Sequence, residues 1–284
     1  MTDSRADTVT RLLAQVREGD REAFDRRQDA AEKLHPLPAL RTYISLGDSI
    51  SIDLYPGLDA AERERLPQMP PGLGAASLLH RNDDGRWPEF TCRDLVSVWP
   101  EVRYVALAED GATTASVLRL QLPRLPEEVE GPVLVTLTAG GNDLVGLLDM
   151  GSAGPALGAP DPAAGLVEEA ARTLERVVRE LRTRFPSAAL LVGTVYDPSD
   201  GTGDLGDGVR RTRELEALAT FNGRVEAIAR GAGATVVPIH HRFLGHGLTE
   251  PDVSNRWYWR HLVIEPSARG ASEVRRLWLE ALGM

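Results

Sequence analysis

A serine follows directly on an apolar run in the stretch YISLGDSIS, residues 43–51. The glycine at position 47 permits a sharp bend there, so the pattern is typical of a buried strand that turns into a helix and presents Ser49 at the bend. The free N–H groups at the start of a helix favour negative charge, which suits a serine nucleophile in acyl transfer. Gly-Asp-Ser is also common in ordinary turns, so the neighbouring groups must decide between the two interpretations.

Two later loops carry groups that could assist such a serine. The segment LAEDGATTASVL follows a second apolar run, and LTAGGNDLVGLL follows a third. Gly111 allows its backbone N–H to approach a substrate oxygen closely, and the Asn142 amide offers two N–H donors. With the Ser49 N–H, these donors would form an oxyanion hole for the negative charge that develops in acyl transfer.

Five short apolar runs predict the strands that position these loops. They begin at Thr42, Arg103, Pro132, Ala189 and Ala234. Amphipathic helical patterns separate or follow them, over residues 166–185, 215–228 and 270–282. Apolar strands that alternate with helices predict a parallel sheet covered on both faces.

Ligands of such sheets bind in the loops beyond the carboxyl ends of the strands. This rule places Ser49, Gly111, Asn142 and Tyr196 along one rim. Two Gly- and Pro-rich segments, residues 150–162 and 197–208, are expected to be surface loops that could shape the site.

The first part of the chain has a different composition. Residues 7–34 are charged and alanine-rich with helical spacing of their apolar positions, and the stretch HPLPAL, residues 35–40, ends that pattern. We therefore expect an N-terminal helical extension over residues 1–39 and one α/β domain over residues 40–284.

Composition restricts the classes of function. The formal net charge of −10 argues against nucleic acid and anionic membrane surfaces as partners, and leaves small neutral or carbonyl substrates. The sequence has no apolar run of signal-peptide or membrane-spanning type, so we expect a cytoplasmic protein. Its one cysteine, Cys92, can form neither an internal disulfide nor a thiolate metal site. The oligomeric state is left open.

The order of the three loops resembles the SGNH or GDSL hydrolase family. The matching blocks are SLGDSIS, EDGATTASVL and GGND. The resemblance implies a three-layer, flavodoxin-like fold with about five parallel strands, and ester hydrolysis without a metal or organic cofactor. It also implies that Ser49 is the nucleophile, that an acyl-enzyme forms on it, and that Gly111 and Asn142 are oxyanion donors. Asp48, beside the nucleophile, is expected to border the substrate.

The fourth block departs from the family pattern, which is Asp-x-x-His-Pro before the last helix. The corresponding text is HLVIEPSARGASEV, in which Glu265 stands in the place of the histidine and Leu262 in that of the aspartate. Glu265 could be the general base if burial raised its pKa, or it could simply interact with backbone N–H groups at a helix start. His261 could be the base instead, or a surface histidine.

Three further residues are candidates for binding substrate. His246 lies in FLGHGL, which resembles a stretch that borders the site in some family members. Trp257, in the aromatic-rich segment NRWYWRHL, could form a wall for a sugar or an aromatic group, or could pack inside the protein. Tyr196 lies at the predicted rim.

Two functions from different classes remain open. The first is a serine hydrolase that acts as an esterase, a lipase-like enzyme or a carbohydrate deacetylase, on a small-molecule ester or an acylated sugar. The second is a catalytically impaired relative that binds a small ligand or a protein partner.

Overall fold

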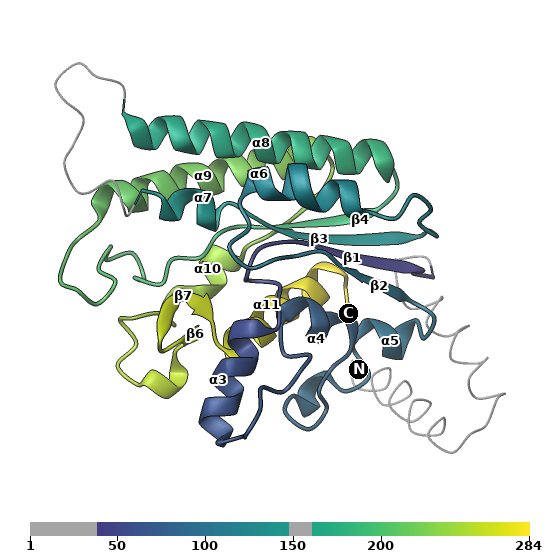
Figure 1. Ribbon diagram of the computed structural model, residues 1–284, viewed down its shortest axis with the longest axis horizontal. Helices are drawn as coiled ribbons and strands as arrows, with labels where there is room; N and C mark the ends of the chain where they lie inside the picture. Colours follow the sequence, from purple (N-terminus) through teal and green to yellow (C-terminus); the bar gives the residue numbers. More distant parts are fainter. Residues whose placement is uncertain (1–38, 148–160) are drawn as a thin grey trace, which may run out of the picture.

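The computed structural model describes residues 39–147 and 161–284, and its centre is a five-stranded parallel sheet in the order β2-β1-β3-β4-β5 (Figure 1). The predicted N-terminal extension and most of the predicted loop at 150–162 lie outside these described residues. The strands are β1 (Thr42–Gly47), β2 (Arg103–Ala106), β3 (Val133–Thr138), β4 (Ala189–Gly193) and β5 (Thr235–Val237). The sequence prediction of a parallel sheet is therefore confirmed.

The sheet is covered on both faces, which explains why its central strands are buried throughout and rich in apolar residues. Every residue of β1 and of β3 is buried, and the two strands pair in register from Thr42 opposite Val133 to Gly47 opposite Thr138. Alternate side chains of a strand point to opposite faces, so Ile44 contributes to the core on one side and Tyr43 to the core on the other.

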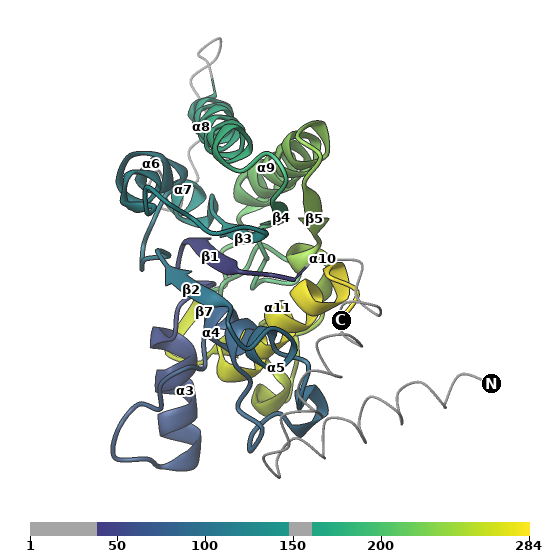
Figure 2. The ribbon, with the colours of Figure 1, turned by 90° about the vertical axis from the view of Figure 1, so that its right-hand side faces the viewer.

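The helices form the two outer layers of a three-layer α/β fold (Figures 1 and 2). On one side lie α6 (Thr114–Ser116), α7 (Gly141–Val145), α8 (Pro162–Arg184) and α9 (Thr212–Gly231). On the other lie α3 (Leu54–Glu64), α4 (Ala75–His80), α5 (Leu95–Val98) and α11 (Ala268–Ala281), with the short helix α10 (Ile239–Phe243) at the edge. Within the described ranges, every helix is too short or too polar to cross a membrane.

The segment before the last helix contains two short strands that the sequence analysis did not predict. Strands β6 (Tyr258–Trp259) and β7 (Leu262–Pro266) pair with each other in antiparallel orientation. The pattern is too short for sequence periodicity to reveal, because β6 has only two residues. Strand β7 delivers Glu265 to the rim of the main sheet, and the Ser267 side chain then caps α11 by accepting from the Gly270 N–H at 3.2 Å.

Candidate active site

The turn that carries Ser49 is built on a glycine that no other residue could replace without strain. Gly47 ends β1 with φ of +124°, and a Cβ at this position would overlap the carbonyl oxygen of Thr138 on β3. The next residue, Asp48, donates its N–H to that same oxygen at 3.0 Å. Ser49 is thereby held where β1 ends, and its side chain borders a cavity.

A buried glutamine fixes this turn from a second element. Gln121 ends the π-helical turn Val117–Gln121, and its amide forms two hydrogen bonds of 2.8 Å with Gly47. In one bond the Gly47 N–H donates to Gln121 Oε1, and in the other Gln121 Nε2 donates to the Gly47 carbonyl. Sequence reasoning missed Gln121, because its partner is 74 positions away and its one local signal is a polar residue among apolar ones.

The loops that carry Gly111 and Asn142 are joined to each other. Asp143 accepts hydrogen bonds from the N–H and the hydroxyl of Thr114, at 2.8 and 2.7 Å. Asn142 Nδ2 donates to the Ala112 carbonyl at 3.0 Å, and Asn142 borders the same cavity as Ser49. Gly111 is exposed with φ of +67°, and no described atom beyond its own chain neighbours lies within 4 Å of the place its Cβ would take. It is not among the residues that border the cavity.

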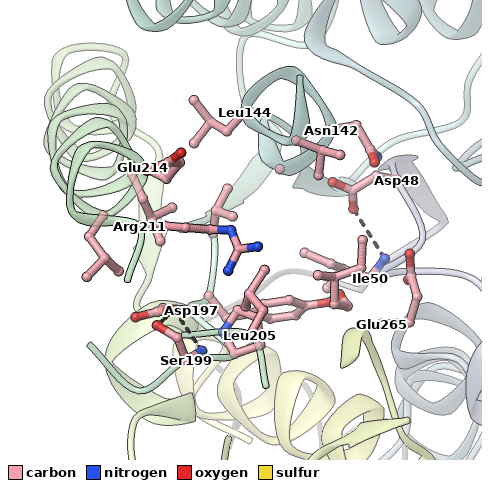
Figure 3. Close-up of a pocket in the computed structure, with 18 of the residues that line it drawn as sticks. Asp48, Ile50, Asn142, Leu144, Asp197, Ser199, Leu205, Arg211, Glu214 and Glu265 are labelled. Carbon is pink, nitrogen blue, oxygen red and sulfur yellow. Dashed lines mark hydrogen bonds between the residues drawn. The ribbon is translucent and has the colours of Figure 1, made fainter. Parts of the chain in front are cut away.

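The cavity beside Ser49 has a volume of about 130 Å³ and opens to solvent. Polar groups lie at two sides of the cavity, and Figure 3 shows Asp48 and Glu265 across from Arg211 and Glu214. Most of the remaining wall is aliphatic, and is formed by Ile50, Leu144, Val145, Val195, Leu205, Leu215, Leu218 and Ile264. A concave, largely apolar site with a few convergent polar groups is typical of small-molecule binding.

Two buried carboxyl groups flank Ser49, and burial changes their acidity. The pKa of Glu265 is raised to about 7, mainly because burial disfavours its charged form. A hydrogen bond with Ser49 acts in the opposite direction, and the negative charges of Asp48 and Asp110 add to the increase. Burial likewise raises the pKa of Asp48 to about 7, against hydrogen bonds from Thr138 and from the Ile50 N–H. Both groups therefore titrate near neutral pH.

The histidine candidates lie elsewhere. His261 is on the surface, with 54% of its side chain exposed, and its Nε2 contacts Glu62 Oε1 of α3 at 3.0 Å. His246 stacks on Trp257 with ring centroids 3.6 Å apart, and burial lowers the pKa of its imidazole. Neither histidine is among the residues that border the cavity.

The aromatic candidates divide into one cavity residue and one core residue. Tyr196 borders the cavity and donates its hydroxyl to the Ile264 carbonyl at 2.7 Å, which holds β7 against the site. Trp257 is 4% exposed and packs edge-on against Phe243, so the structure places it in the core rather than on the cavity wall. The apolar indole ring explains this placement, because its burial removes a large area from water.

The segment from Asp197 to Arg211, which we call the cover loop, supplies the wall opposite Ser49. Gly203, Leu205 and Arg211 of this loop border the cavity. Asp200 ties the loop to residues 245–249 by accepting from the N–H groups of Gly245, Gly247 and Thr249 at 2.9 to 3.1 Å. Sequence analysis expected a surface loop here, but the contribution of Arg211 was missed.

The described residues contain no cluster of three or more His, Cys, Asp or Glu side chains placed to hold a metal ion. The polar groups around Ser49 can donate hydrogen bonds, accept a proton and bind a carbonyl oxygen. These are the operations that acyl transfer requires.

Comparisons with known proteins agree with this fold. The architecture is similar to an extracellular lipase from Streptomyces rimosus (20% identity, TM-score 0.54, covering 86% of this chain and 98% of the lipase). It is also similar to phospholipase A1 from Streptomyces albidoflavus (21%, 0.51, 86% and 99%) and to an acetylxylan esterase from Geobacillus stearothermophilus (18%, 0.52, 86% and 94%). No curated protein matches the chain. A family model matches residues 45–272, and the chain therefore belongs to the GDSL-like lipase/acylhydrolase family.

Proposed function

We propose that the protein hydrolyses a small-molecule ester through an acyl-enzyme on Ser49, with Glu265 as the general base. The observation that carries the proposal is the Glu265 carboxyl, which is buried, borders the same cavity as Ser49 and has a pKa raised to about 7. An ordinary carboxylate is too weak a base to accept a proton from a serine hydroxyl at neutral pH. A carboxylate whose pKa lies near the working pH is a stronger base and can accept this proton more readily.

The first half-reaction follows from this geometry. Ser49 Oγ attacks the carbonyl carbon of the ester while its proton passes to Glu265. The charge on the carbonyl oxygen is stabilised by the N–H groups of Ser49 and Gly111 and by Asn142 Nδ2, which has a second N–H besides the one donated to Ala112. Glu265 then gives its proton to the alcohol oxygen as the C–O bond breaks, which leaves the acyl group on Ser49.

The second half-reaction repeats these roles with water. Glu265 accepts a proton from water as the water oxygen attacks the acyl carbon, and returns it to Ser49 Oγ as the acid is released. Asp48 would stay protonated in part of the molecules during this cycle, because its pKa is also raised to about 7. Two negative charges side by side at Asp48 and Glu265 are thereby avoided.

A fluorophosphonate probe tests the proposal directly. We expect the wild-type protein to be labelled on Ser49, as identified by mass spectrometry of the peptide, and Ser49→Ala to remain unlabelled. A folded wild-type protein that neither reacts with the probe nor hydrolyses p-nitrophenyl esters would instead be a binding protein. The predicted cytoplasmic location is a separate proposal, and immunodetection in cell fractions would test it.

Removal of one oxyanion donor gives a graded prediction. Asn142→Ala is expected to lower kcat by roughly two to three orders of magnitude, with a smaller change in KM, because the donor acts mainly on the charged intermediate. Steady-state kinetics on one ester would measure it. Asn255→Ala, a change on the exposed surface, is the matched control and should keep wild-type kinetics. An unchanged kcat in Asn142→Ala would exclude Asn142 from the oxyanion hole.

The raised pKa values also predict a cost in stability. Between pH 4.5 and 7 an unfolded Glu265 loses its proton while the folded one keeps it, so the free energy of unfolding falls as pH rises through this window. Glu265→Gln removes this cost and is expected to stabilise the protein at pH 8 by about 3 kcal/mol, with little effect at pH 4. Thermal unfolding at both pH values measures the difference. Equal Tm changes at the two pH values would contradict the burial of an ionisable Glu265.

A further inference from the structure

The aliphatic wall of the cavity ends at a charged group. Ile50 adjoins Ser49 in the sequence, and Leu144, Leu205 and Leu218 are further aliphatic residues that border the same cavity. Figure 3 shows Arg211 reaching into the space between Leu144 and Leu205, on the side of the cavity opposite Asp48 and Glu265. We infer that the aliphatic wall holds the acyl chain of the ester and that Arg211 sets the upper limit on the length of that chain. This inference rests on the proposed esterase function.

Arg211 is held in place by its own loop. Its Nη1 donates to Asp207 Oδ1 at 2.9 Å and to the Val209 carbonyl at 3.1 Å, and its Nη2 contacts the other Asp207 oxygen. The side chain is 19% exposed although Asp207 is 49% exposed, so the guanidinium faces inward while its partner lies at the surface. The Arg211 N–H also donates to the Gly203 carbonyl at 3.0 Å, which closes the base of the loop.

A charged group at this place limits chain length for a physical reason. Each methylene that packs on the aliphatic wall is removed from water, which favours binding by about fourfold. A methylene that reaches Arg211 gains no apolar neighbour there and removes water from the charged pair, which opposes binding. The kcat/KM of the enzyme should therefore rise with the length of the acyl chain, and then fall where that chain meets the Arg211 guanidinium.

Recognition of an anion by Arg211 is disfavoured by the surrounding charges. Asp207 already forms a two-point ion pair with the guanidinium. The cavity is also bordered by the carboxyl groups of Asp197, Glu214, Asp48 and Glu265. A negatively charged substrate would meet this acidic set, so a neutral alkyl chain is the better match.

A series of p-nitrophenyl esters from acetate to palmitate tests the limit, because the leaving group stays constant while the acyl chain grows. In the wild type we expect kcat/KM to rise to a maximum at a medium chain and then fall. In Arg211→Met, which keeps an extended apolar side chain, the maximum should move by at least two carbons, and the ratio of long-chain to short-chain kcat/KM should increase at least tenfold. Arg210→Met, at an exposed position of the same loop, is the matched control and should keep the wild-type profile.

A second variant guards against misfolding of the first. Asp207→Asn weakens the hold on Arg211 from the surface side and should move the profile in the same direction by a smaller amount, with folding checked by circular dichroism. An unchanged chain-length profile in the folded variants would overturn the inference, while Ser49 labelling and ester hydrolysis by the wild type would leave the proposed function intact. Loss of hydrolysis of a glutaryl half-ester in Arg211→Met, without a change in the alkyl series, would identify Arg211 as an anion-binding group and would also overturn it.

Discussion

Ser49→Ala is expected to lower kcat for ester hydrolysis by at least about four orders of magnitude, since it removes the atom on which the acyl-enzyme forms. The protein should still fold, because the turn is held by Gly47 and Gln121 rather than by the Ser49 side chain. Stopped-flow or steady-state assays with a p-nitrophenyl ester would measure the loss, and circular dichroism would confirm the fold.

Ser51→Ala is a matched control from the same turn. Its hydroxyl lies 2.9 Å from Thr138 Oγ1 and is directed into the protein, so its removal should leave at least a tenth of the activity. Comparable losses of kcat in the two variants would mean that either substitution disturbs the whole turn. Such a result would contradict the assignment of Ser49 as the nucleophile.

Glu265→Gln is expected to lower kcat by about two to four orders of magnitude, which is the usual contribution of a positioned general base. In the wild type, activity should increase as pH rises through about 7, because Glu265 must lose its proton before it can accept one from Ser49. This pH-dependent limb should disappear in the variant, although the amide preserves the size and the hydrogen-bonding ability of the side chain. A kcat–pH profile for both proteins would measure these effects.

His261→Ala separates this mechanism from the histidine alternative. His261 contacts Glu62 on the surface and lies outside the cavity wall, so its removal should change kcat by less than about threefold. If His261→Ala were inactive while Glu265→Gln kept most of the activity, the histidine would be the base and the Glu265 proposal would be wrong.

Local patterns predicted the sheet because each strand carries its own signal. The runs at Thr42, Pro132 and Ala189 needed no knowledge of distant residues, since strands buried on both faces are rich in apolar residues along their whole length. The loops at their carboxyl ends followed from the topology. Placement of Asn142 beside the cavity of Ser49 was therefore accessible from sequence, and its catalytic role stays a prediction.

Residues whose function depends on distant contacts were not accessible in this way. Gln121 meets Gly47 across 74 positions, and Arg211 reaches the cavity through the fold of a glycine-rich loop. Trp257 shows the reverse case, since an aromatic side chain can line a sugar site or fill a core, and its neighbours decide which. The type of a residue defines which roles its side chain can take. Contacts with residues far along the chain determine which of these roles it has in the folded protein.

The bonds of Asp200 make two loops into one mechanical unit. One carboxylate accepts from three backbone N–H groups between Gly245 and Thr249 and from the Thr249 hydroxyl, and the Leu248 N–H donates to the Pro198 carbonyl at 2.8 Å. Local opening of either segment would break the same bonds, so both belong to one cooperative unit. Replacement of the cover loop alone would therefore leave the N–H groups of residues 245–249 without the carboxylate that accepts from them, so the two segments can be exchanged only together.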